Sequence, residues 1–176
     1  MGQVISEDSL IIELQRQKRN GRRIVFTNGC FDLLHPGHVS SLEQARSLGD
    51  CLVVGLNDDA SVRLLKGPER PLLPERERAA ILAALAAVDY VVLFSQPTPR
   101  ELIARIAPDI LAKGADWDGR EIAGREEVES TGGEVRTLNL DPGYSTTRLL
   151  EELKRMARGG ASAASRGFPP DGKGRG

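Results

Sequence analysis

Aromatic side chains and cysteines are scarce in this sequence. Phenylalanine, tyrosine and tryptophan make up 4% of the 176 residues, whereas 40% of all residues are hydrophobic. A folded core must therefore be built mainly from aliphatic side chains. Cys30 and Cys51 are the only cysteines, too few for a disulfide framework in a chain of this length. We expect both thiols to be reduced and mostly buried.

Long apolar runs and an excess of charge of one sign are also missing. The formal net charge of -1 gives no overall attraction to nucleic acid or to anionic membranes. No apolar run approaches the ~18 residues that span a bilayer. The N-terminus lacks the basic start and apolar middle of a secretory signal. The sequence therefore favours a cytoplasmic protein that binds neither nucleic acid nor membrane.

Apolar strands alternate with amphipathic helices along the chain. Strands are predicted at 24–28, 51–56, 90–94, 109–114 and 133–138, and helices at 6–19, 38–48, 59–65, 75–87, 99–106 and 146–156. This alternation is typical of a Rossmann-like α/β fold, an open parallel sheet with helices on both faces, here in a single domain. We expect an N-terminal helix over 1–21, the main domain over 22–157 and a flexible, glycine-rich tail over 158–176.

The most informative segment is NGCFDLLHPGH at 28–38, directly after the first predicted strand. It contains both histidines of the chain, His35 and His38. Ligands of open parallel sheets bind beyond the carboxyl ends of the strands. His38 stands where a helix starts, and free backbone N–H groups and the helix dipole attract anions there. Gly37 lacks a Cβ, so backbone can approach a ligand closely. The segment predicts a polyphosphate site.

Two other interpretations of the histidines remain open at this point. One histidine could be a solvated loop residue and the other a helix cap. The pair could also bind zinc, which would need a third ligand such as Asp32 or Cys30. A glycine-bearing turn into a helix suits phosphate better than zinc, so we expect no metal held by the protein itself.

The segment GCFDLLHPGH resembles the HxGH signature of the cytidylyltransferase-like superfamily of nucleotidyltransferases. The resemblance covers about residues 22 to 156, and within the superfamily it is greatest to the adenylyltransferases of bacterial ADP-heptose synthesis. The stretches that carry it are FTNGCFDLLHPGHVSSLEQARSLGD, VVGLNDDASVRLLKG, RPLLPERERAAILAALAAVDYVV, PDILAKGADW and STTRLL. The resemblance implies transfer of AMP from ATP to D-glycero-β-D-manno-heptose 1-phosphate. The products would be pyrophosphate and ADP-heptose, a precursor of the lipopolysaccharide core or a related heptose glycan.

The same resemblance implies roles for single residues. His35, His38 and Lys66 would be catalytic. Asp32 and Arg78 would contact the substrate. The nucleotide would be bound by a larger set, formed by Thr27, Asn28, Gly29, Cys30, Phe31, Gly37, Lys113, Ser145, Thr146 and Thr147.

Several of these residues have a second interpretation. Asp32 can anchor the histidine-bearing turn instead of touching the substrate. Lys66, predicted in a loop with glycine and proline, and Arg78, predicted on a helix beside the alternative Arg76, are residue types that are usually solvated. The Ser-Thr-Thr at 145–147 can be a plain helix N-cap as well as a phosphate site.

Two rival functions share this fold. A cytidylyltransferase acting on a small alcohol phosphate is one, but Asp-Pro-Gly-Tyr stands here where the glycerol-phosphate cytidylyltransferases have Arg-x-x-Gly-Ile. A non-catalytic nucleotide sensor is the other, because a fold does not prove an activity. We also expect Mg²⁺ to accompany ATP, since few cations face a triphosphate. The resemblance further implies a separate heptose 7-phosphate kinase and a homodimer.

Overall fold

We describe the protein from a computed structural model, which covers residues 1–114, 122–139 and 146–158. The chain divides into two compact units, Met1–Thr146 and Thr147–Gly176. The first unit contains the whole sheet described below. In the second, the described residues belong to helix α7 (Thr146–Arg158).

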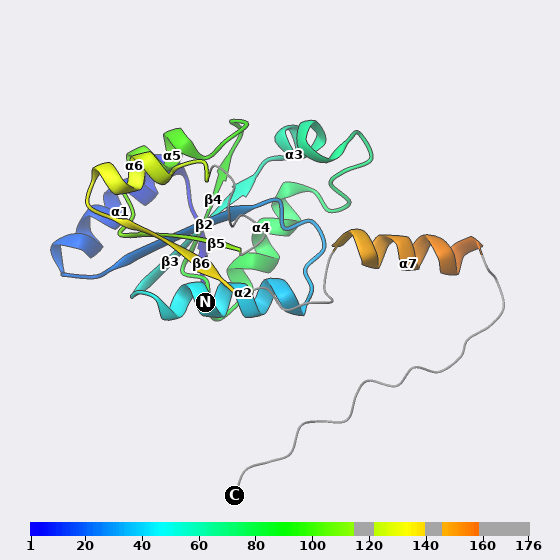
Figure 1. The fold of residues 1–176 in the computed structure, drawn as a ribbon, viewed down its shortest axis with the longest axis horizontal. Coiled ribbons are helices and arrows are strands. Elements are labelled where there is room, and N and C mark those ends of the chain that lie inside the picture. Colours follow the sequence, from blue (N-terminus) through cyan, green and yellow to red (C-terminus); the bar gives the residue numbers. More distant parts are fainter. Residues whose placement is uncertain (115–121, 140–145, 159–176) are drawn as a thin grey trace, which may run out of the picture. The chain divides into compact units, whose positions relative to one another are not determined.

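A six-stranded sheet forms the centre of the first unit, and every pair of neighbouring strands is parallel (Figure 1). The strands are β1 (Gln3–Val4), β2 (Ile24–Gly29), β3 (Cys51–Asn57), β4 (Tyr90–Phe94), β5 (Ile110–Gly114) and β6 (Glu134–Leu138). Their order across the sheet is β1-β4-β3-β2-β5-β6. Chain connections leave in opposite directions on the two sides of the β2–β5 pair, which makes this pair the switch point where ligands of such sheets bind.

Helices cover both faces of the sheet (Figure 1). One face carries α1 (Glu7–Arg19), α5 (Arg100–Ile106) and α6 (Arg125–Ser130). The other face carries α2 (Pro36–Ser47) and α4 (Glu75–Ala84). A further helix, α3 (Asp59–Lys66), directly follows the carboxyl end of β3. The predicted open parallel sheet with helices on both faces is confirmed.

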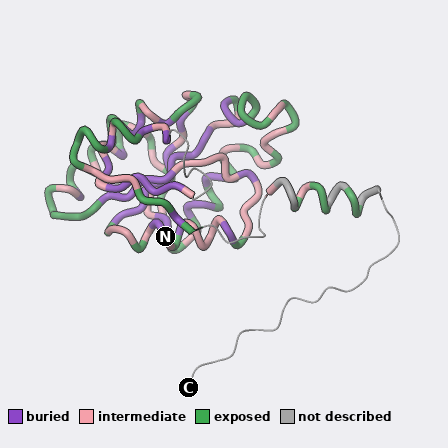
Figure 2. The backbone as a smooth tube through the Cα atoms, in the orientation of Figure 1, coloured by how far each residue is buried: buried purple, intermediate pink, exposed green. Residues whose placement is uncertain are grey.

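The core consists of two mainly aliphatic clusters, one on each face of the sheet. Strand β3 is buried along its whole length, as Figure 2 shows for the middle of the sheet. The cluster under α1 and α5 includes Leu10 and Ile103, and the cluster under α2 and α4 includes Leu42 and Leu82. Each fully buried side chain of this size contributes ~1.5–3 kcal/mol. Phe26 and Phe94 are the only buried aromatic residues among those described, so the expected aliphatic core is confirmed.

Most predicted elements are present, with shifted ends. Ser6 caps α1 by accepting a hydrogen bond from the Ser9 N–H at 3.4 Å. Asp58 caps α3, since its carboxylate accepts from the Ser61 N–H at 2.7 Å. Helix α4 ends at Ala84, three residues before the predicted end, because Leu85 adopts an extended backbone.

Two elements were not predicted, and one residue was misplaced. Strand β1 has only two residues and forms by pairing with β4, so its sequence carries little signal of its own. Helix α6 buries only Val128 and therefore lacks a clear apolar stripe. Lys66 is the last residue of α3, whereas it was expected in the loop that follows. Apart from Arg158, the predicted tail lies outside the described residues. No helix in the described ranges is long and apolar enough to cross a membrane.

Candidate active site

Both histidines lie at the N-terminus of α2, just beyond the carboxyl end of β2. His35 is the N-cap residue, with extended backbone (φ -140°, ψ 166°), and Pro36 is the first helical residue. Proline suits that position because its fixed φ is already helical and it lacks an N–H that would go unpaired. The helix therefore begins two residues earlier than predicted, which places His38 within its first turn. Both imidazoles stand where free N–H groups and the helix dipole favour an anion.

The two imidazole rings stack on each other. Their centroids are 3.8 Å apart with an angle of 21° between the planes. The ring of Phe31 packs against His38 from another side, at 5.3 Å and 56°. The Nδ1 atom of His38 is buried and makes no hydrogen bond to any described residue. A buried imidazole nitrogen in this state is available for a ligand.

Burial favours the neutral form of both histidines. Desolvation, with a smaller effect of the nearby His35, lowers the pKa of His38 from 6.5 to about 4. Burial also lowers the pKa of His35. A neutral imidazole donates one hydrogen bond, and an incoming polyphosphate would favour its protonation by opposite charge. The pair can therefore respond to negative charge that develops on phosphate oxygens.

The turn between β2 and α2 is tightly built around Phe31. This residue has φ 42°, a left-handed conformation that is uncommon for a bulky side chain. A Cβ on Gly29 would lie 3.1 Å from the Phe31 ring, so glycine allows the ring to fold back there. Thr27 is 8% exposed, and Asn28, Gly29 and Cys30 are half-buried along the predicted nucleotide-binding stretch. The backbone of this stretch ends at the switch point of the sheet.

Lys113 and Asn28 meet across that switch point. Lys113 stands near the end of β5, is 7% exposed, and donates a hydrogen bond from Nζ to Oδ1 of Asn28. The two residues come from adjacent strands that are far apart in sequence. A buried ammonium at this position adds positive charge at the place where the fold binds ligands.

Asp32 and Arg78, expected to contact the substrate, are both turned into the protein. The Arg78 side chain is fully buried and bonds four protein oxygens, which leaves it no exposed face. Asp32 is 3% exposed; one oxygen accepts from the N–H groups of Leu72 and Leu73, and the other lies 2.6 Å from Nε of Arg70. Of the two roles left open for Asp32, these contacts match the anchor of the turn.

The Asp32–Arg70 pair was not singled out from the sequence as a pair. Each residue alone is of a common type, and only the loop after α3 brings Arg70 back to the turn after β2. Lys66 differs from both, because its side chain is exposed. Burial raises the pKa of the half-buried Cys30 thiol, while the charges of Lys66 and Arg78 oppose this rise. Lys66 therefore stands close enough to the turn for its charge to act on it.

The start of α7 reaches the histidine-bearing turn within the first unit. The Thr146 hydroxyl donates to the carbonyl of Leu33 at 3.3 Å. Ser145 and the side chain of Thr147, the other predicted phosphate ligands of this segment, lie outside the described residues. In the part of the chain that the structure describes, no three His, Cys, Asp or Glu side chains are grouped to hold a metal ion.

Comparison with known proteins supports a family assignment. Residues 26–152 match the family described as Cytidylyltransferase-like. The chain is 56% identical over 148 residues to the Bifunctional protein HldE of Pelobacter propionicus, which covers 84% of this chain and 30% of that protein. It is 52% identical over 150 residues to the Bifunctional protein HldE of Shewanella sp. (strain ANA-3), and the match covers 85% of this chain and 32% of that protein. The chain thus spans about a third of the length of these relatives.

Two solved structures share the fold. The lipopolysaccharide core biosynthesis protein from Thermoplasma volcanium is 29% identical with a TM-score of 0.57, covering 69% of this chain and 98% of that one. Pantoate-beta-alanine ligase from Francisella tularensis, complexed with beta-gamma ATP and beta-alanine, is 13% identical with a TM-score of 0.56. The match covers 90% of this chain and 80% of that one. The second likeness concerns the fold alone.

Proposed function

The chain belongs to the cytidylyltransferase-like family of nucleotidyltransferases, and from this premise we propose that it transfers AMP from ATP to D-glycero-β-D-manno-heptose 1-phosphate. The products are ADP-heptose and pyrophosphate. The observation that carries the proposal is the stacked pair of imidazoles at the N-terminus of α2, next to the switch point of the sheet. The choice of substrate rests on the resemblance to the ADP-heptose adenylyltransferases and on the likeness to the HldE proteins.

The reaction is a direct displacement at the α-phosphorus of ATP. A phosphate oxygen of the sugar 1-phosphate attacks this phosphorus, and the bond to the oxygen that bridges the α and β phosphates breaks. Such chemistry depends on positioning and on neutralising charge, with no covalent enzyme intermediate. His35 and His38 donate hydrogen bonds to the α-phosphate and to the leaving group as its charge grows. Lys66, exposed at the end of α3, closes onto the phosphates when both substrates are bound.

The remaining contacts bind the nucleotide. Backbone N–H groups of the stretch 27–31 and of the first turn of α2 face the phosphates, together with the charge of Lys113. The hydroxyl groups of the Ser-Thr-Thr segment at 145–147 bind the nucleotide phosphates as well. ATP arrives as its Mg²⁺ complex, in which the ion is held by phosphate oxygens and neutralises part of the pyrophosphate charge.

The test measures product formation from ATP, Mg²⁺ and heptose 1-phosphate by anion-exchange chromatography. CTP, GTP and UTP run in parallel, and CTP is also tested with glycerol phosphate. We expect ADP-heptose and pyrophosphate in equal amounts from ATP and the sugar phosphate alone, with turnover lost in excess EDTA. A preference for CTP and an alcohol phosphate, binding of ATP without turnover, or full activity in EDTA would each contradict the proposal.

Two finer points belong to the same proposal. The sugar 1-phosphate derives from heptose 7-phosphate. A separate kinase in the cytoplasm acts on this 7-phosphate sugar. The protein itself works as a homodimer. Sedimentation equilibrium at micromolar protein concentration measures the second point, and a mass other than twice 19.1 kDa would contradict it.

A further inference from the structure

Among the described residues, Arg78 has the largest fully buried side chain, and this side chain is charged. Its guanidinium donates from Nε to Leu73 O at 2.9 Å and from Nη2 to the Asp59 carboxylate at 2.7 Å. Nη1 donates to Cys30 O at 2.6 Å and to Asn57 O at 2.9 Å. A buried charge is retained only where its hydrogen bonds are nearly complete, as they are here.

The acceptors of Arg78 lie at places that shape the active site. Cys30 follows the end of β2, and Asn57 is the last residue of β3. Leu73 belongs to the loop that Asp32 also holds. One planar side chain on α4 therefore fixes the exits of two neighbouring strands and the loop beside them. A lysine could not reproduce this, because its single ammonium lacks the fixed fork of donors.

The bond to the Cys30 carbonyl determines the orientation of the next residue. In a trans peptide the C=O and the following N–H point in opposite directions. When the Cys30 carbonyl is held towards Arg78, the Phe31 N–H is turned away from Arg78. Phe31 adopts φ 42°, a conformation that persists only when surrounding contacts impose it. The hydrogen bond from Arg78 is such a contact, acting on the peptide directly before Phe31.

Phe31 passes this constraint on to the histidines. Its ring packs on His38 with centroids 5.3 Å apart, and His38 stacks on His35 at 3.8 Å. A continuous chain of contacts thus runs from Arg78 through the Cys30 carbonyl and the Phe31 ring to both imidazoles. No link in this chain requires Arg78 to touch a substrate.

We propose that Arg78 is a positioning residue, which holds the Cys30–Phe31 peptide so that the Phe31 ring packs on His38 and keeps the two imidazoles in their stacked arrangement. The placement of the rings stands on the geometry alone, and its consequence for turnover rests on the proposed function. The expected substrate contact of Arg78 is replaced by this role.

The decisive test follows the histidine resonances by NMR during a pH titration. The chain has only two histidines, so each imidazole signal can be assigned by substituting the other. Arg78→Lys keeps the charge and removes the fork, which should free the Phe31 ring and admit water to His38. We expect the pKa of His38 to rise from about 4 by at least about one unit towards 6.5. Arg19→Lys, at an exposed arginine on α1, should leave it unchanged.

A second variant keeps the test decisive if Arg78→Lys does not fold. Phe31→Gly removes the ring and accepts the left-handed conformation without strain. It should raise the pKa of His38 in the same way, and adding Arg78→Lys to it should cause little further rise. A folded Arg78→Lys or Phe31→Gly protein with unchanged His38 titration would overturn the proposal.

Activity gives an independent measurement. Arg78→Lys and Phe31→Gly should each lower kcat by roughly 10–10², with a smaller change in KM for ATP, because misplaced groups cost most in the transition state. The double variant should lose little more than either single variant, since both break the same chain of contacts. Multiplicative losses would contradict the coupling. If the wild-type protein transfers no AMP, the proposed function fails, whereas the NMR titration still decides the role of Arg78.

Discussion

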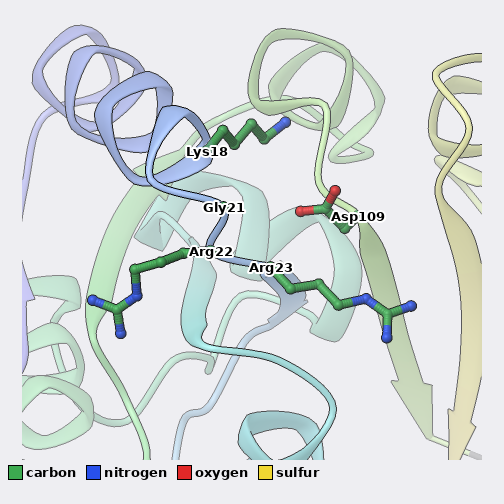
Figure 3. Close-up of a pocket in the computed structure, with 5 residues that line it drawn as sticks. All are labelled: Lys18, Gly21, Arg22, Arg23 and Asp109. Atoms are coloured by element: carbon green, nitrogen blue, oxygen red, sulfur yellow. The ribbon is translucent and has the colours of Figure 1, made fainter.

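The two ends of the parallel strands, called here the amino edge and the carboxyl edge of the sheet, both carry positive side chains but use them differently. At the amino edge lies a pocket of about 420 Å³. It is lined by the five residues drawn in Figure 3, which are Lys18, Gly21, Arg22, Arg23 and Asp109. The carboxyl edge carries the histidines and Lys66, and none of these residues lines that pocket. A hollow with basic residues is therefore found on the side of the sheet where the chemistry is not expected.

Bonds within the protein explain the difference at the amino edge. The Lys18 ammonium donates to the carbonyls of Ile106 and Ala107, at the C-terminal end of α5 where a cation is favoured. Arg22 donates to the Asp50 carbonyl at 2.7 Å. Arg23 pairs with a glutamate of β6 at 2.7 Å. These cations hold the ends of elements together.

The polar groups of the histidines and Lys66 at the carboxyl edge make fewer bonds within the protein. His38 Nδ1 is buried without a partner among the described residues, Phe31 holds a left-handed conformation, and Lys66 is exposed. Strained and incompletely bonded groups are typical of functional sites. The functional site is therefore recognised by polar groups without a bonding partner and by strained backbone. A cavity alone does not identify it. Substitutions at the two edges should therefore affect turnover and stability in opposite proportions.

The largest effect should come from the histidines. His35→Ala and His38→Ala should each lower kcat by ~10²–10⁴, the scale of losing a hydrogen-bond donor to the transition state. The fold should survive, since both histidines are only half-buried and stand at the start of α2, outside the strands of the sheet. Steady-state kinetics with circular dichroism as the folding control measures both. Wild-type turnover in the double variant would contradict the mechanism.

Lys66→Ala should have the next largest effect. Its exposed side chain contributes little to stability, so Tm should stay within a degree or so of wild type. Turnover should fall by roughly 10–10² because one phosphate contact is lost. Arg63→Ala, at an exposed position on the same helix, is the matched control. A variant that melts early yet remains fully active when folded would show Lys66 to be structural.

The amino edge should give the reverse result. The Asp109 carboxylate accepts from the buried Ile24 N–H at 2.7 Å, at the start of β2. Asp109→Ala leaves that N–H without its acceptor and should lower the free energy of unfolding by about 1–3 kcal/mol. Turnover of the folded variant should change less than about twofold. Urea denaturation and kinetics measure the two effects, with the surface variant Asp8→Ala as control. A kinetic loss larger than the loss of stability would place functional groups at this edge.

The smallest effect concerns pH. The folded pKa of His38, about 4, lies below the unfolded value of 6.5, so the unfolded chain binds more protons between these limits. Its contribution to stability is fully present above pH 6.5 and is lost as the pH falls towards 4. Allowing for partial exposure, wild type should lose about 1 kcal/mol relative to His38→Gln between pH 7.5 and pH 5. Parallel urea-unfolding results for the two proteins would show that His38 is not protected in the folded state.

The sequence by itself determined the alternation of elements and the place of the histidines. Buried strands such as β3 are continuous apolar runs, and Ser6 caps α1 through atoms three residues away. The His-Pro-Gly-His segment follows the first predicted strand directly. These features depend on burial and on hydrogen bonds between near neighbours, which the order of residues records.

Only the tertiary structure decided what the isolated polar residues do. An arginine on a helix is usually exposed. The residues near Arg78 in the sequence do not indicate that its side chain donates to the carbonyls of Cys30 and Asn57. Asn28 and Lys113 meet across 85 residues, and Thr146 reaches Leu33 across 113. Such contacts follow from the order of the strands, because parallel strands bring their carboxyl ends to one edge whatever their separation along the chain.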